Sequence, residues 1–147
     1  MEEKFMQEAL KEAKKAYEKL EIPVGAVIVK DNKIIARAHN LKETKKSAIA
    51  HAEILAIEKA NKKLDNWRLL DCEMYVTLEP CEMCMGAIAS SRIKKIYIGT
   101  LDPKKEEKLD VNKFKEKYGI DIDLGIKQEE CEYILKEFFK FLRKNGG

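Results

Sequence analysis

The sequence predicts an α/β fold in three layers (α/β/α), in which helices cover both faces of a mixed five-stranded sheet. Three observations lead to this expectation. Both ends of the chain carry apolar residues at helical spacing, β-branched segments alternate with helical segments through the middle, and a tight turn at Asp31-Asn32 joins the first two strand segments. The expected order is helix, strand, strand, helix, strand, helix, strand, a charged segment, strand and helix.

The first helix and the hairpin are expected within residues 3–38. Apolar side chains recur at three- and four-residue steps over residues 3–20, and Pro23 ends this helix. Residues 24–30 are apolar and β-branched, and residues 33–38 return as the second strand. This hairpin makes the sheet mixed, because the later strands are expected to run parallel. The apolar face of the helix comprises Met6, Ala9, Ala13, Ala16, Tyr17 and Leu20.

The middle of the chain alternates helix and strand. Residues 39–50 are polar and irregular, and a helix is expected from His51 to about Lys63. Residues 74–78 form a strand, after which Pro80 opens a helix that runs to about Ser91. Residues 95–100 are expected to form the next strand of the sheet.

The last third begins with a charged segment. Residues 101–119 are dense in lysine and glutamate, residues 120–126 alternate as a strand, and residues 128–144 form an amphipathic helix. Its apolar face carries Ile134, Leu135, Phe138, Phe139 and Leu142. We expect one of the two phenylalanines to pack in the core and the other to cover the mouth of a site.

Length and composition indicate one domain over residues 1–147. Hydrophobic residues make up 45% of the chain and charged residues 37%, which is typical of a soluble globular protein. The first residues lack the apolar region of a signal peptide, and the longest apolar run, residues 22–29, is too short to cross a bilayer. We therefore expect a cytoplasmic protein with no membrane partner. A net charge of +3 permits an RNA partner without demanding one.

Two short motifs point to a catalytic metal. His51-Ala52-Glu53 and Pro80-Cys81-Glu82-Met83-Cys84 together match H-x-E followed by P-C-x-x-C, the known signature of zinc-dependent base deaminases. The i, i+3 spacing places both cysteine sulfurs on one helix face. A catalytic zinc keeps three protein ligands and one open position, so we expect one Zn²⁺ per chain, held by His51, Cys81 and Cys84. Glu53 then moves the protons.

The alternatives are a closed structural zinc site, a redox C-x-x-C, and a binding module without catalysis. A structural site would need a fourth ligand, and His39, Cys72 and Cys131 lack paired spacing. His39 is expected to be a loop or packed histidine, and the two cysteines small buried residues. Glu53 argues against a non-catalytic module, because a carboxylate beside a three-ligand metal has no structural purpose.

Beyond the motif, residues 1–103 resemble the bacterial tRNA-specific adenosine deaminases (the TadA type) of the cytidine-deaminase-like superfamily. The segments that carry the resemblance are Ile22-Pro23-Val24-Gly25-Ala26-Val27, Asn40, Ala50-His51-Ala52-Glu53-Ile54, Asn66-Trp67-Arg68-Leu69, Tyr75-Val76-Thr77-Leu78-Glu79-Pro80-Cys81, Gly86-Ala87-Ile88 and Ser91-Arg92-Ile93. The resemblance implies a cytidine-deaminase-like fold and a homodimer. It also implies conversion of adenosine to inosine at the wobble position of a tRNA anticodon stem-loop.

The resemblance also implies substrate contacts. Asn40 matches an asparagine that contacts the flipped nucleoside, Asp102 matches an aspartate on the RNA-facing rim, and Ala52 and Phe139 complete the expected set. The backbone amide of Cys81 is expected to polarise the attacked site. The alternative for Asn40 is a turn residue at the hairpin exit, and for Asp102 an opener of an Asp-Pro turn. Trp67 is expected in the core or at a dimer interface.

The segment after Asp102 departs from the family. Residues 103–109 read Pro-Lys-Lys-Glu-Glu-Lys-Leu and lack the glycines that let a loop approach RNA closely. Residues 101–131 are instead similar to small free-cytosine deaminases of the same superfamily. A deaminase of a free base or nucleoside, such as cytosine or guanine, is therefore the alternative to an enzyme that acts on tRNA.

Overall fold

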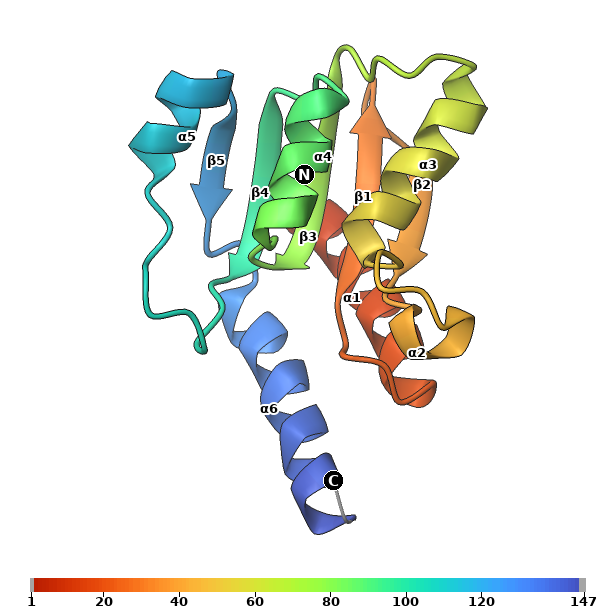
Figure 1. The fold of residues 1–147 in the computed structure, drawn as a ribbon, viewed down its shortest axis with the longest axis vertical. Helices are drawn as coiled ribbons and strands as arrows, with labels where there is room; N and C mark the ends of the chain where they lie inside the picture. The colour runs from red at the N-terminus through yellow and green to blue at the C-terminus, as the bar shows by residue number, and fades with distance from the viewer. Residues whose placement is uncertain (1, 146–147) are drawn as a thin grey trace.

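Five strands form one mixed sheet in the order β2-β1-β3-β4-β5 in the computed structural model, which describes residues 2–145 (Figure 1). β1 runs antiparallel to both β2 and β3, whereas β3, β4 and β5 run parallel to one another. The predicted mixed sheet of five strands is confirmed. The strands are β1 (Gly25–Lys30), β2 (Lys33–His39), β3 (Cys72–Leu78), β4 (Lys95–Thr100) and β5 (Asp121–Leu124).

Helices cover both faces of this sheet, as the sequence predicted. Figure 1 shows α3 and α4 in front of the sheet and α1 behind it, while α6 extends below. The helices are α1 (Glu2–Glu18), α2 (Lys42–Lys45), α3 (Ala52–Leu64), α4 (Glu82–Ser90), α5 (Val111–Tyr118) and α6 (Gln128–Lys144). Among residues 2–145, no helix combines the length and the apolar composition needed to cross a bilayer.

Alternating strand residues build two cores, one on each face of the sheet. Ile28 and its neighbours on one face pack against Ala52, Ala56, Met85 and Ile88 of α3 and α4. The opposite face carries Val27, Val29, Tyr75 and Tyr97, which pack against α1 and α6 through residues that include Met6, Ala9, Ala13, Cys131 and Ile134. Successive side chains of a strand point to opposite faces of the sheet. Because helices cover both faces, the residues of β1 are apolar on both.

Two glycines let the rear helices approach the sheet closely. A Cβ added at Gly25 in β1 would collide with the backbone carbonyl oxygen of Ala9 in α1. A Cβ added at Gly99 in β4 would collide with the sulfur of Cys131 in α6. Cys131 and Cys72 are both buried, which confirms the prediction that they pack as small hydrophobic residues.

Three local expectations were wrong or incomplete. Residues 111–118 form α5 inside the charged segment 101–119, for which no helix was predicted. The helix forms because the Asp110 side chain accepts a hydrogen bond from the Lys113 N–H, and Gly119 ends it at φ 68°. Phe114 packs this helix against the front core. The short helix α2 was likewise not expected, and β5 is shorter than residues 120–126.

Leu20 does not belong to the core face of α1. The helix ends at Glu18, and Leu20 follows with φ 60° and 56% of its surface exposed. The Leu20 N–H donates to the Tyr17 carbonyl and the Glu21 N–H to the Ala16 carbonyl, which is the Schellman ending of a helix. The left-handed residue of that ending turns Leu20 away from the face that its spacing suggested.

Candidate metal centre

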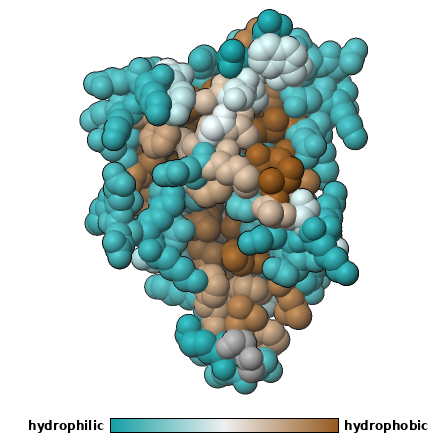
Figure 2. Space-filling view, viewed as in Figure 1, coloured by the Kyte–Doolittle hydropathy of each residue, from teal (hydrophilic) through white to brown (hydrophobic). Residues whose placement is uncertain are grey.

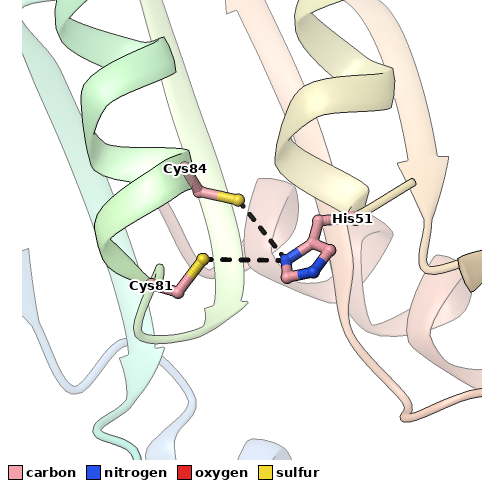
Figure 3. A group of neighbouring side chains, drawn as sticks. All are labelled: His51, Cys81 and Cys84. Atoms are coloured by element: carbon pink, nitrogen blue, oxygen red, sulfur yellow. Dashed lines mark hydrogen bonds between the residues drawn. The ribbon is translucent and has the colours of Figure 1, made fainter. Parts of the chain in front are cut away.

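His51, Cys81 and Cys84 meet at the N-terminal ends of α3 and α4. One ligand atom from each lies within 4.8 Å of the other two. The sulfurs of Cys81 and Cys84 lie 3.8 and 3.6 Å from Nδ1 of His51, and Figure 3 shows all three side chains turned toward one point. Cys81 and Cys84 follow His51 by 30 and 33 positions in the chain. The fold brings the three residues together because α3 and α4 start at the same edge of the sheet.

This geometry fits a zinc ion. Tetrahedral zinc with bonds of about 2.0–2.1 Å to nitrogen and about 2.3 Å to sulfur places the nitrogen and each sulfur roughly 3.6 Å apart. The observed separations are 3.6 and 3.8 Å. One imidazole nitrogen and two thiolates also form a donor set that zinc prefers, and a three-ligand site leaves one position for water or substrate.

The local backbone leaves these ligands free for a metal. His51 and Cys81 occupy the N-cap positions of α3 and α4 in extended conformation, and neither side chain caps its own helix. Both helices therefore direct the positive ends of their dipoles at the site, where they stabilise thiolates. Cys84 is buried, whereas His51 and Cys81 are partly exposed, so the site is closed on one side and accessible on the other.

Burial sets the protonation of the ligands in the absence of a metal. Burial, and secondarily the charge of Lys42, lower the pKa of His51, which favours the neutral imidazole that binds metals. Burial, followed by the charge of Glu53, raises the pKa of the Cys84 thiol. A divalent cation reverses the second effect, because it stabilises the thiolate directly.

Glu53 lies in the first turn of α3, with 4% of its surface exposed. Burial raises its pKa to about 7, and hydrogen bonds from its own backbone N–H and from Cys84 oppose the rise. A carboxyl group with a pKa near neutrality both accepts and releases a proton readily. The structure therefore places a group with this property in contact with one of the candidate metal ligands.

Asn40 and Ala52 are joined by a hydrogen bond at the start of α3. The Ala52 N–H donates to Oδ1 of Asn40 over 2.7 Å. Because His51 does not cap the helix, Asn40 supplies an acceptor for the first helical amide from outside the helix. The side chain therefore has a structural role of its own, other than that of a hairpin turn residue.

Replacing Asn40 tests this structural role. Alanine removes the acceptor, and we expect a loss of about 1 kcal/mol in the free energy of unfolding. Aspartate keeps an acceptor for the Ala52 N–H, and its negative charge suits a helix N-terminus, so N40D is expected to retain wild-type stability. Urea unfolding of both variants checks this; equal destabilisation would contradict it.

Asp102 and Phe139 line a separate groove of about 930 Å³ between α6 and the ends of β3 and β4. Phe138 is buried, as expected of the core phenylalanine, and Phe139 is half-buried in the groove, where its covering of the site mouth stays a prediction. Oδ1 of Asp102 accepts a hydrogen bond from the Lys104 N–H over 2.9 Å, so this aspartate does open a turn. The metal ligands do not line the groove, but Leu78, three residues before Cys81, does.

Two buried glutamates beside the ligand loops were not singled out from the sequence. Glu21 accepts hydrogen bonds from the Glu43 N–H and from the N–H and hydroxyl of Thr44, which anchors α2 before His51. Glu79 accepts one from the Asp102 N–H and pairs with Lys105. The partners of each glutamate lie more than twenty residues away from it in the chain, so no local sequence pattern reveals these contacts.

His39 and Trp67, for which the sequence left more than one role open, are not among the candidate metal ligands. His39 is packed, with Nδ1 2.8 Å from the Glu12 carboxylate and Nε2 2.9 Å from Lys19 Nζ. Trp67 is 51% exposed, and the Arg68 guanidinium lies 4.3 Å from its ring centroid. A core position for Trp67 is therefore wrong.

Comparison with known proteins places these observations in a family context. The MafB19-like deaminase family matches residues 1–143. A tRNA-specific adenosine deaminase of Bacillus subtilis is 48% identical, with 97% of this chain and 91% of the relative covered. A solved structure from a study of A-to-I editing by tRNA:A34 deaminases superposes with a TM-score of 0.83 at 40% identity, over 90% of this chain and 99% of that one.

A guanine deaminase of Bacillus subtilis is a further similar structure. It is 41% identical with a TM-score of 0.65, and the match covers 67% of this chain and 64% of the other. The shared region is thus shorter than that shared with the tRNA:A34 deaminase structure.

Proposed function

The chain belongs to the family of tRNA-specific adenosine deaminases, and we propose that it uses a zinc ion to convert adenosine 34, at the wobble position of a tRNA anticodon, to inosine. The observation that carries this proposal is the convergence of His51, Cys81 and Cys84 on one point, with the buried Glu53 beside them. The reaction consumes one water molecule and releases one ammonia.

His51, Cys81 and Cys84 would hold the metal. A bound zinc ion would act there as a Lewis acid, which lowers the pKa of water and so would supply a nucleophile at neutral pH. The contribution of the protein is the placement of three ligands at two helix N-termini, with Cys84 buried and the other two ligands reachable from one side. This arrangement supports a catalytic rather than a closed structural site.

Glu53 would move the protons. It accepts one proton from the attacking water as the bond between oxygen and C6 forms, and delivers that proton to the ring nitrogen N1. It then accepts the second proton from the new C6 hydroxyl and delivers it to the exocyclic nitrogen, which leaves as ammonia when its bond to C6 breaks. A pKa of about 7, caused by burial, matches this double duty near neutral pH.

Asn40, Ala52, Asp102 and Phe139 are proposed to contact the substrate. Asn40 and Ala52 lie at the start of α3, whereas Asp102 and Phe139 line the groove beyond the β3 end. The two positions suit a target base at the metal and neighbouring nucleotides along the groove. A base in an anticodon loop is unpaired, which lowers the cost of turning it into such a site.

A homodimer is the proposed assembly. Exposed apolar side chains flank both ends of α3, and Figure 2 shows apolar surface over α4 and the adjoining side of α3 between hydrophilic margins. Such a surface favours burial against a partner. Sedimentation velocity at micromolar concentration is expected to give about twice the chain mass of 17.0 kDa. The exposed residues are Ile49, Trp67, Leu70 and Met83.

A deaminase of a free base is the second candidate. Two observations favour it: the similarity to a guanine deaminase over two thirds of the chain, and the absence of glycine from residues 103–108. Both are weaker than the match to the tRNA enzymes, which extends over nearly the whole chain.

Inosine formation decides between the two. Zinc-loaded protein is incubated with an anticodon stem-loop RNA that carries adenosine at position 34, and parallel reactions contain free cytosine, guanine or adenosine. We expect inosine in the digested RNA and no ammonia from the free compounds. A stem-loop with guanosine at position 34 serves as the matched control. Ammonia from a free base with unchanged RNA would overturn the proposal.

A further inference from the structure

Adjacent lysines after β4 reach two different parts of the molecule. Nζ of Lys104 lies 4.0 Å from the ring centroid of Phe139 on α6. Nζ of Lys105 lies 3.0 Å from Oε2 of Glu79 and donates to the Pro80 carbonyl oxygen over 3.2 Å. The segment after Asp102 is therefore attached to α6 on one side and to the loop before Cys81 on the other.

Glu79 is the buried centre of this attachment. Its side chain is 4% exposed, and each carboxylate oxygen has a partner: Oε1 accepts from the Asp102 N–H over 3.0 Å, and Oε2 pairs with Lys105. The Glu79 N–H donates to the carbonyl of Thr100 over 2.9 Å. A buried carboxylate requires such partners, so removal of Lys105 leaves a charge incompletely compensated.

The bond from Lys105 to the Pro80 carbonyl constrains the amide of Cys81. Residues 2–145 contain no cis peptide bond, so the Pro80 oxygen and the Cys81 N–H belong to one planar trans unit and point in opposite directions. Holding the oxygen on the side of Lys105 holds the N–H on the opposite side. The same peptide leads directly into the Cys81 side chain at the metal centre.

We propose that Lys105 is a positioning residue of the deaminase. It acts through Glu79 and Pro80 to fix the Cys81 amide and sulfur relative to Asp102, and it does not touch the substrate itself. The inference rests on the proposed function, because the geometry that it maintains matters for turnover only if the metal centre is catalytic. It also assigns a role to a segment whose sequence departs from the family.

The competing explanation is that Lys105 only adds positive charge near an RNA ligand. Lys108 provides the matched control, because it is an exposed lysine of the same segment whose side chain has no hydrogen bond or ion pair with any part of the chain between residues 2 and 145. Methionine at either position removes one positive charge, but only K105M removes the contacts with Glu79 and Pro80.

The kinetic test compares K105M, K105R and K108M with the wild type on the stem-loop RNA. We expect kcat of K105M to fall roughly 10- to 100-fold, since small displacements of reacting groups have effects of this size. K105R keeps a donor for Glu79 and Pro80 and is expected to recover most of kcat. K108M is expected to change KM at most. Equal kcat for K105M and K108M would overturn the proposal. A fall in the kcat of K105M that is caused by loss of zinc or by unfolding would overturn it as well.

A second readout does not depend on activity. Amide hydrogen exchange of the zinc-loaded protein is expected to be faster in K105M than in the wild type at Asp102, whose N–H donates to Glu79, and at Glu79, whose N–H donates to Thr100, and unchanged in K108M. Unchanged exchange in K105M would overturn the positioning role even if kcat fell. If the wild type forms no inosine, the proposed function fails, whereas the exchange experiment still decides whether Lys105 orders the loop.

Discussion

Glu53→Gln is expected to lower kcat for inosine formation by about 10²- to 10⁴-fold, the range that a positioned acid–base group contributes. Glutamine has nearly the same shape as glutamate, so the buried position in the first turn of α3 remains filled. It cannot exchange protons between water, ring nitrogen and ammonia. Single-turnover formation of inosine with saturating enzyme measures the chemical step directly.

Metal content distinguishes this effect from damage to the site. E53Q is expected to retain one zinc per chain, because Glu53 is not among the three convergent ligands. The matched control is Glu58→Gln on the exposed side of the same helix, which is expected to keep wild-type kcat. Wild-type turnover in E53Q would show that Glu53 is not the proton carrier, whereas loss of its zinc would contradict the assignment of the metal to three ligands without Glu53.

Removal of zinc is expected to reduce inosine formation to the background rate and to lower Tm. A ligand that binds only the folded state stabilises it by about 4.1 kcal/mol at a thousandfold excess over Kd, so the zinc-free protein should unfold more easily. Adding zinc after the chelator has been removed is expected to restore both properties. Metal analysis, thermal unfolding and the RNA assay on the same samples check this.

Cysteine variants assign the metal to its ligands. Cys81→Ala and Cys84→Ala are expected to lose zinc and activity, whereas Cys72→Ala, at a buried cysteine outside the group of candidate ligands, is expected to retain both. Zinc affinity should fall as the pH is lowered, because bound thiols must lose their protons and the pKa of Cys84 is already raised by burial. Full activity of C84A with no bound metal would rule out the proposed zinc chemistry.

Local periodicity predicted most of the secondary structure because it depends only on neighbouring residues. The strand segments around Val27 and Tyr75 and the helical spacing of residues 128–144 led to the observed elements. The failures at Leu20 and in residues 101–119 have one common origin. A left-handed residue ended α1 two residues early, and a short helix capped by Asp110 arose within a highly charged stretch. Apolar spacing detects neither event, because both depend on backbone caps.

The sequence by itself identified the chemistry, since His51, Glu53, Cys81 and Cys84 occur in a spacing specific enough to indicate a zinc-dependent deaminase. Only the tertiary structure decided how the site is supported: which phenylalanine is buried, which amide Asn40 binds, and which lysine reaches the buried Glu79. The physical reason is that the side chains needed for the reaction lie within two short motifs, which can be read from neighbouring residues. The supporting contacts of the site join loops distant in sequence, and these meet only when the sheet has brought both helix N-termini to one edge.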